Sequence, residues 1–256
     1  MKLKEKLWNW GHLEGSHNAC TKLDCKMTPE AFAEEYGIPN AFIVSYGGNI
    51  QPPFDGLAER FSGLREVKWS VLGDCSTPLP AHELGNTEDI LAVAADSNLT
   101  GGIVDDFFSP ERLEKFPPAV LKKIRNRLHA EGLDFWAVLY AHQLDMDLSA
   151  YLDCFDGVSF WIWDRESLSE TDSLVKRFEK LVSGKKKMLG IYLWDYAGER
   201  PMDPALFRKQ IETYFGKLCD GSVDGVVFCS GVLGDADLET NRILKETVKK
   251  YGDTEV

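Results

Sequence analysis

The chain has 256 residues, of which 44% are hydrophobic and 11% aromatic, a composition that is sufficient to close a substantial core. Its net charge of −12 argues against binding a nucleic acid, because affinity for a polyanion depends on cationic contacts to phosphate. No apolar run approaches the roughly 20 residues of a membrane-spanning helix, and the N-terminal segment lacks the apolar stretch of a signal peptide. We therefore expect neither nucleic acid nor membrane as a partner. The expected location is cytoplasmic as the sequence is written, or secreted if the chain is a trimmed form.

Short runs rich in β-branched and aromatic residues alternate along the whole chain with amphipathic stretches of helical length. The predicted strands, in chain order, cover 6–11, 41–47, 66–73, 101–107, 134–142, 157–164, 188–195 and 225–231. The predicted helices that follow them cover 28–37, 55–64, 86–99, 109–133, 147–155, 169–184, 203–219 and 237–252. Most of these helices begin with Ser, Thr, Asp or Asn followed by Pro or an acidic residue, which is typical of an N-cap.

Strands that are buried on both faces and separated by helices predict a parallel sheet, and eight such units are the number that closes a (β/α)8 barrel. The alternative is an open doubly wound sheet, but the phosphate-binding fingerprint GxGxxG of that fold is missing after the first strand. No linker, low-complexity tract or change of composition divides the chain. The prediction is an α/β protein with a single TIM-barrel domain over residues 1–256, in which eight parallel strands alternate with eight helices.

In such a barrel the active site is built at the C-terminal ends of the strands. The predicted ends carry acids, imidazoles and aromatic rings, and Trp and Tyr at a barrel mouth offer flat apolar faces on which sugar rings stack. We therefore expect a carbohydrate ligand and no cofactor. The residues expected to bind the ligand are Trp10, His12, Tyr46, Tyr140, His142, Trp161, Trp163, Tyr192 and Trp194. The residues expected to act on it are Asp105, Asp106, Asp164 and Asp195.

The fourth predicted strand ends in GGIVDDFFSP (101–110), which places two aspartates side by side. Neighbouring like charges near apolar surface must be compensated by hydrogen bonds, a shared proton or a cation. A helix cap does not explain the pair, because the Ser-Pro-Glu sequence that follows already supplies the cap. Period-2 alternation predicts that Gly102, Val104 and Asp106 face the barrel interior. Asp105 would then point toward the helix layer, unless the strand turns there.

Paired carboxyl groups suit the cleavage of a glycosidic bond. One group must be protonated to donate to the leaving oxygen, and the other must be ionised to attack or to stabilise positive charge at the anomeric carbon. Two neighbouring acids whose environments separate their pKa values meet that need.

With these strand ends the chain resembles the (β/α)8 glycoside hydrolases, and the resemblance implies three pairings of acids. The α-galactosidase-like barrels use the ends of strands four and six, which implies Asp106 with Asp164. The large retaining clan uses strands four and seven, which implies Asp106 with Asp195, although the usual acids there are glutamates. The adjacent pair is similar to that of the O-GlcNAcase and hyaluronidase-type hexosaminidases, in which the substrate acetamide is the nucleophile. The carboxyl group that lies close to Asp106 decides among the three, and Asp105 alone would indicate assistance by an acetamido group.

Two other functions fit the same strand ends. A metal-dependent sugar isomerase or epimerase would hold a divalent ion with acidic and imidazole ligands. The residues that could serve are Asp74, Asp106, His142 and Asp164, although glutamate is scarce at the strand ends. A non-catalytic carbohydrate-binding barrel would use the aromatic side chains without a working pair of acids.

The six cysteines form no CxxC pair, and buried free thiols are expected because free Cys is among the residues most often buried. Cys20, Cys25 and Cys75 lie in predicted loops, with His12 and His17 nearby. Their spacing matches no standard zinc pattern. We therefore predict no tightly bound structural zinc and no other metal.

Overall fold

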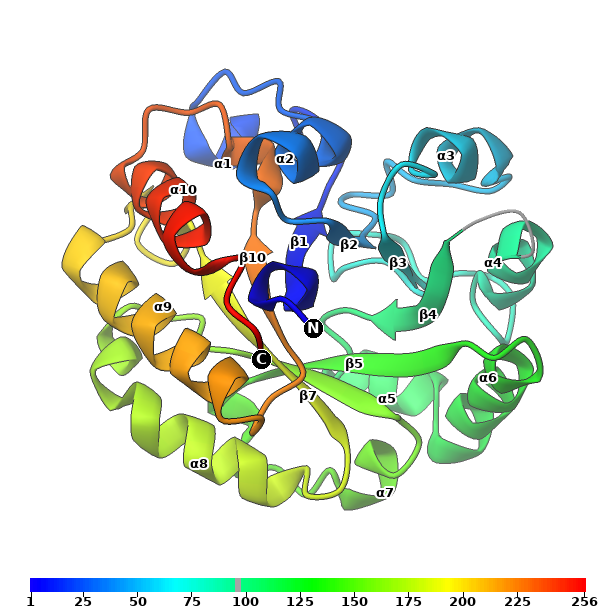
Figure 1. The fold of residues 1–256 in the computed structure, drawn as a ribbon. Coiled ribbons are helices and arrows are strands. Elements are labelled where there is room, and N and C mark those ends of the chain that lie inside the picture. The colour runs from blue at the N-terminus through cyan, green and yellow to red at the C-terminus, as the bar shows by residue number, and fades with distance from the viewer. Residues whose placement is uncertain (95–97) are drawn as a thin grey trace.

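Eight parallel strands close into a barrel in the computed structural model, which describes residues 1–94 and 98–256. The barrel strands are β1 (Leu7–Gly11), β2 (Asn40–Ile43), β3 (Glu66–Ser70), β4 (Leu99–Val104), β5 (Asp134–Tyr140), β6 (Gly157–Trp161), β7 (Lys186–Tyr192) and β10 (Gly225–Cys229). Each strand pairs in parallel with its neighbours, and β10 pairs with both β7 and β1, which closes the ring. The predicted (β/α)8 barrel is confirmed (Figure 1).

The helices form the outer layer around these strands (Figure 1). They are α1 (Asn18–Thr21), α2 (Pro29–Tyr36), α3 (Asp55–Arg60), α4 (Thr87–Ala94), α5 (Pro110–Lys115), α6 (Pro118–Ala130), α7 (Ser149–Leu152), α8 (Thr171–Leu181), α9 (Pro204–Cys219) and α10 (Glu239–Tyr251). Short 3-10 turns are η1 (Leu3–Lys6), η2 (Ala141–Gln143), η3 (Glu166–Glu170) and η4 (Gly231–Leu233). Within the described ranges, no helix has the length and apolar character that crossing a bilayer requires.

Some predicted boundaries differ from the structure. The helix predicted over 109–133 is two helices, α5 and α6, because Pro117 disfavours helical backbone at the residue before it and Pro118 begins a new helix. The strand predicted over 41–47 ends at Ile43. The strand predicted over 188–195 ends at Tyr192, and a separate antiparallel hairpin of β8 (Trp194–Asp195) and β9 (Arg200–Pro201) follows it. Residues 95–97 of the helix predicted over 86–99 lie outside the described residues.

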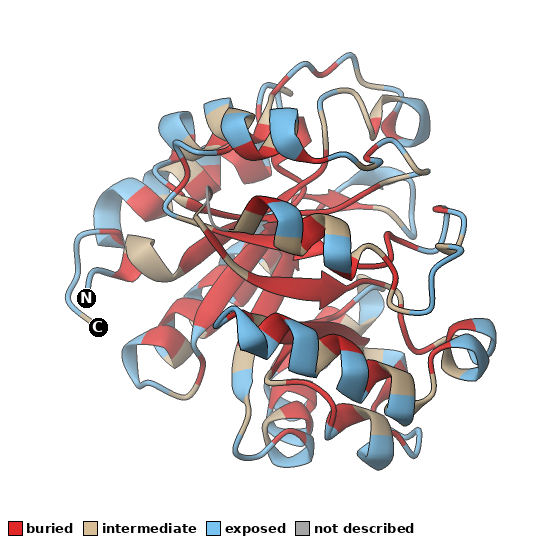
Figure 2. Ribbon diagram, turned by 90° about the vertical axis from the view of Figure 1, so that its right-hand side faces the viewer, coloured by how far each residue is buried: buried red, intermediate tan, exposed pale blue. Residues whose placement is uncertain are grey.

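Large aromatic side chains fill the barrel interior, and glycines on the adjacent strands make room for them. Trp136 of β5 stands beside Gly157 of β6, and Trp161 of β6 stands beside Gly190 of β7. A Cβ atom at Gly157 would lie 2.5 Å from the indole of Trp136, and one at Gly190 would lie 2.1 Å from that of Trp161. Side chains at these glycines are therefore excluded. The barrel strands are buried on both faces over most of their length, and most of the exposed surface lies on the outer helices and loops (Figure 2).

The faces of β4 are the reverse of those predicted. A Cβ atom at Gly102 would lie 3.1 Å from Leu128 on α6, so this position faces the helix layer and not the interior. Ile103 stands beside the interior residue Trp136 and faces inward. Continued alternation places Asp105 on the inner face, the position that the period-2 pattern had predicted for Asp106.

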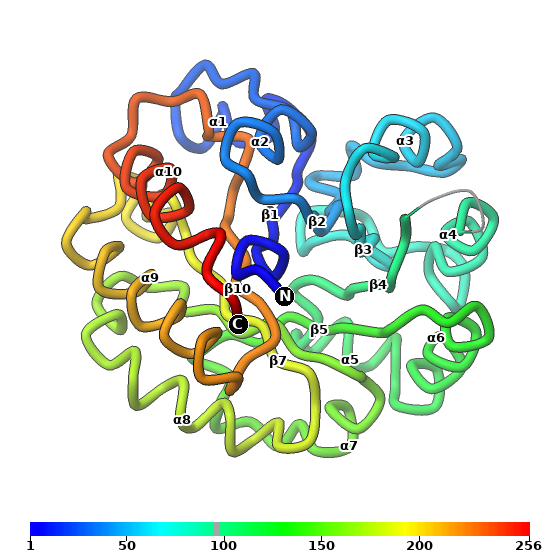
Figure 3. The backbone as a smooth tube through the Cα atoms, viewed as in Figure 1, coloured from blue at the N-terminus to red at the C-terminus, as the bar shows by residue number. Residues whose placement is uncertain are grey.

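The two ends of the chain lie together at the N-terminal end of the barrel (Figure 3). Lys2 forms an antiparallel bridge with Glu255, and the main-chain nitrogen of Val256 donates to the carbonyl oxygen of Met1 over 2.8 Å. Since β1 begins a few residues later, this junction is at the opposite end of the barrel from the strand ends that carry the candidate site.

A lysine is buried inside the lower part of the barrel. Lys68 of β3 is 3% exposed, and its ammonium group lies 5.2 Å from the ring centroid of Trp8 and 5.3 Å from that of Trp136. It donates to the hydroxyl of Thr100 over 3.1 Å and lies 4.0 Å from the carboxylate of Asp134. Burial lowers the pKa of Lys68 to about 8, because the charged form loses its hydration. The charge is held by two indole faces and one distant carboxylate.

Replacement of Lys68 by Met is expected to raise the free energy of unfolding at pH 7, because a buried charge is removed while an unbranched apolar stem is kept. Relative to Lys68→Met, the wild-type protein should gain stability as pH rises from about 8 to 10.5, since the unfolded chain binds the Lys68 proton more tightly than the folded one. The full contribution of this titration to the free energy of unfolding is about 3 kcal/mol. Urea unfolding at a series of pH values measures it.

The control is Lys123→Met, at an exposed lysine paired with Glu83. This variant should keep the wild-type dependence on pH. The same dependence in Lys68→Met would contradict the prediction.

Candidate active site

A cavity of about 560 Å³ opens at the C-terminal ends of the barrel strands, within the range of small-molecule sites. The structure brings most of the residues that were predicted to form a site to its walls. Those residues are Trp10, His12, Tyr46, Asp105, Asp106, Tyr140, His142, Trp163 and Tyr192.

Two of the predicted aromatic residues lie elsewhere. Trp161 is part of the barrel interior below the cavity, where its indole nitrogen donates to the hydroxyl of Ser159 over 2.9 Å. Trp194 packs against Cys25, Leu233 and Leu238 in a separate apolar cluster. Both side chains are almost fully buried, so neither offers a face to a ligand in this cavity.

Two of the predicted acids also lie outside the cavity walls. Asp164 accepts a hydrogen bond from the main-chain nitrogen of Ser167 over 2.8 Å, which caps the turn before α8. The carboxylate of Asp195 accepts from the main-chain nitrogen of Gly198 over 2.8 Å and from Arg200 Nε over 2.9 Å. These contacts form the β8–β9 hairpin. Both aspartates therefore hold loops together rather than facing Asp106.

Several cavity residues were not among those predicted to bind or act on a ligand. They are His17, Cys20, Asp74, Cys75, Ser76, Ser109, Gln143, Tyr196 and Cys229. Each is the last residue of a barrel strand or lies in the loop that follows a strand. The general rule that the βα loops of a barrel build its active site applies to all of them. Ser109 was expected to cap α5, but its hydroxyl makes no capping hydrogen bond.

Asp105 and Asp106 both face the cavity because the backbone turns between them. Asp106 has φ = 47°, in the left-handed region that non-glycine residues seldom adopt. Its main-chain nitrogen donates to Asp105 Oδ1 over 2.8 Å. Its own carboxylate accepts from the hydroxyl of Tyr140 over 2.7 Å and from the main-chain nitrogen of Cys75 over 3.1 Å. Because of this turn, the side chains of two consecutive residues point into the same cavity.

The two carboxyl groups have different environments. Burial raises the pKa of Asp105 well above its usual value, and the nearby charges of Asp106 and Asp74 raise it further. Burial also raises the pKa of Tyr140, so its phenol remains a hydrogen-bond donor to Asp106. The environment of Asp105 therefore favours the protonated form of its carboxyl group.

A buried arginine holds the two strand ends that carry the cavity acids. Arg112 of α5 is 3% exposed, and its Nη1 donates to the carbonyl oxygens of Gly73 and Asp105 over 2.9 Å each. Its Nη2 donates to the carbonyl oxygen of Asp74. The guanidinium therefore fixes the loops after β3 and β4 against each other and keeps a positive charge near Asp105.

Aromatic rings form one wall of the cavity. Trp163 is 41% exposed, which is unusual for an indole, and its ring centroid lies 5.5 Å from that of Tyr192 and 6.1 Å from that of Tyr196. The ring of Tyr140 lies 6.3 Å from it. Exposed, flat apolar faces of this kind suit the apolar side of a sugar ring.

Two histidines lie across the cavity in their neutral form. Burial lowers the pKa of His12 to about 4 and that of His17 to about 2. The Nδ1 atom of His17 lies 2.6 Å from the hydroxyl oxygen of Tyr196, which ties the loop after β1 to the hairpin after β7. Neither imidazole supplies positive charge to the site at neutral pH.

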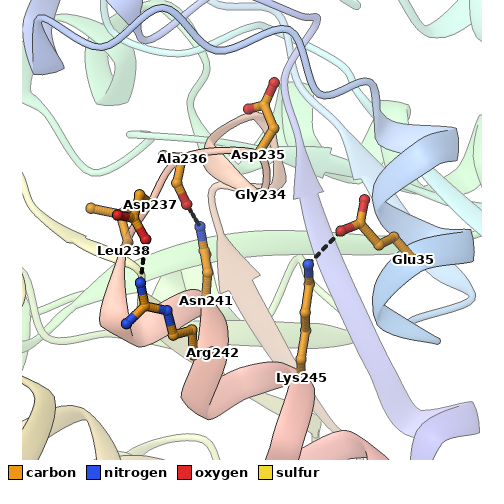
Figure 4. A pocket seen from close by; sticks show the side chains of 9 residues that line it. All are labelled: Glu35, Gly234, Asp235, Ala236, Asp237, Leu238, Asn241, Arg242 and Lys245. Atoms are coloured by element: carbon orange, nitrogen blue, oxygen red, sulfur yellow. Dashed lines mark hydrogen bonds and ion pairs between the residues drawn. The ribbon is translucent and has the colours of Figure 1, made fainter.

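A second cavity, between α2 and the loop before α10, has charged walls (Figure 4). Lys245 pairs with Glu35 and Arg242 pairs with Asp237, so these charges already neutralise each other. The side-chain nitrogen of Asn241 donates to the carbonyl oxygen of Ala236 over 3.0 Å. Because these charged side chains pair with one another, they hold the loop against the helices. The barrel mouth is therefore the better candidate site.

Within residues 1–94 and 98–256, no group of three or more His, Cys, Asp or Glu side chains is arranged to hold a metal ion. Of the acids and histidine considered for a metal-dependent isomerase, Asp74, Asp106 and His142 line the cavity and Asp164 does not.

Replacement of Asp105 by Asn is expected to raise the free energy of unfolding at pH 7. A carboxyl group with a raised pKa in the folded state contributes stability below its unfolded pKa and loses it as pH rises toward the folded one. Asn keeps the acceptor for the Asp106 nitrogen and cannot ionise. Thermal unfolding between pH 4 and 8 should show a flatter decline for the variant. Asp145→Asn, at an exposed carboxylate, should behave like the wild type, and a stability loss in Asp105→Asn at pH 7 would count against a protonated Asp105.

No family model matches the chain, and no curated protein matches it. Its fold is similar to that of the spore cortex-lytic enzyme SleL of Bacillus megaterium QM B1551, with 12% identity over 94% of this chain and 74% of that one and a TM-score of 0.56. It is also similar to the PgaB (BpsB) glycoside hydrolase domain of Bordetella bronchiseptica, with 11% identity over 98% of this chain and 100% of that one and a TM-score of 0.53. The tryptophan synthase α-subunit of Pyrococcus furiosus shares 15% identity over 98% of this chain and 99% of that one, with a TM-score of 0.54. At such identities the likeness shows the (β/α)8 barrel alone.

Proposed function

We propose that the protein hydrolyses the glycosidic bond of a 2-acetamido-2-deoxy sugar, with the acetamido group of the substrate as the nucleophile. The observation that carries the proposal is the pairing of Asp105 with Asp106 at the cavity. Asp164 and Asp195, the partners that the other two classes of glycosidase would use, hold loops outside it. Asp74, the other carboxylate among the described residues that line the cavity, accepts hydrogen bonds from the hydroxyls of Ser76 and Thr77. The substrate itself is therefore the better source of the nucleophile.

The two acids can divide the chemistry between them. Asp105 donates its proton to the leaving oxygen as the bond from that oxygen to C1 breaks, and the acetamido oxygen attacks C1 to form an oxazolinium ion. The carboxylate of Asp106 accepts the N–H of this ion and stabilises its positive charge. Water then attacks C1 and gives its proton to Asp105, which restores the acetamide. Two successive attacks at C1 retain the anomeric configuration.

Further residues support this assignment. Tyr140 donates to Asp106 and keeps it oriented as an acceptor, and Arg112 holds the carbonyl oxygen of Asp105 in place. The exposed face of Trp163 provides a stacking surface for the sugar ring. Two structures of similar fold come from a spore cortex-lytic enzyme and a glycoside hydrolase domain, which is consistent with this class of reaction.

Replacement of Asp106 by Asn, or of Asp105 by Asn, is expected to lower kcat for an aryl 2-acetamido-2-deoxy glycoside by about 10²-fold or more, because each removes one half of the acid pair. Asp164→Asn is the matched control and should leave kcat unchanged, since Asp164 lies outside the cavity. The wild-type rate should fall as pH rises through the raised pKa of Asp105. Initial rates with substrates of both anomeric configurations measure these effects.

A series of substrates with increasingly fluorinated acetamido groups tests the nucleophile directly. Fluorine withdraws electrons from the carbonyl oxygen, so the rate should fall steadily along the series if that oxygen attacks C1. A rate that is independent of fluorination would contradict substrate assistance. If sugars bind but no glycoside is hydrolysed, the non-catalytic carbohydrate-binding barrel becomes the better description.

A further inference from the structure

We draw no further inference here: the strongest candidate, the charged cavity between α2 and the loop before α10, where the side-chain oxygen of Asn241 has no hydrogen-bond partner among the described residues, carries no proposal because the charged side chains around it already pair with one another or with the main chain and nothing in the structure shows which ligand would reach that oxygen.

Discussion

The indole rings inside the barrel determine where open space can exist. A small eight-stranded barrel has just enough interior for side chains, and Trp136 and Trp161 occupy it because Gly157 and Gly190 on the next strands yield the room. With the middle and lower levels filled, the remaining volume lies at the C-terminal mouth. Trp136, together with Trp8, also flanks the ammonium group of Lys68, so two groups of buried charge coexist in one barrel.

The cavity depends on a balance between buried charges that do not contact each other directly. Arg112 binds main-chain carbonyl oxygens, so its hydrogen bonds position the loops while its charge acts through space on the acids above. That charge lowers the pKa of Asp105, but burial and the neighbouring carboxylates outweigh it. The raised pKa of Asp105 favours its protonated form, which suits the role of a general acid.

Sequence periodicity was sufficient to predict the barrel, because the pattern of each strand and helix extends over several residues. The candidate site was less predictable, because its details depend on single backbone angles and on contacts between distant segments. The shifted faces of β4 bring Asp105 inward, and the positive φ of Asp106 turns its side chain toward the same cavity. No local sequence pattern signals either feature. In the hairpin after β7, Asp195 forms an ion pair with Arg200 and does not line the cavity. The ends of the predicted strands therefore identify candidate site residues, and the structure of the loops determines which of these residues face the cavity.

The junction of the two chain ends has a practical consequence for handling the molecule. Because Lys2 and Glu255 are bridged at the end of the barrel opposite the cavity, an affinity tag, fluorophore or surface tether on either end is held away from the mouth. Ends this close can also be joined by a short peptide, and new ends can be opened in an exposed loop. The cavity could then be attached to a sensor surface from different directions while its walls stay unchanged.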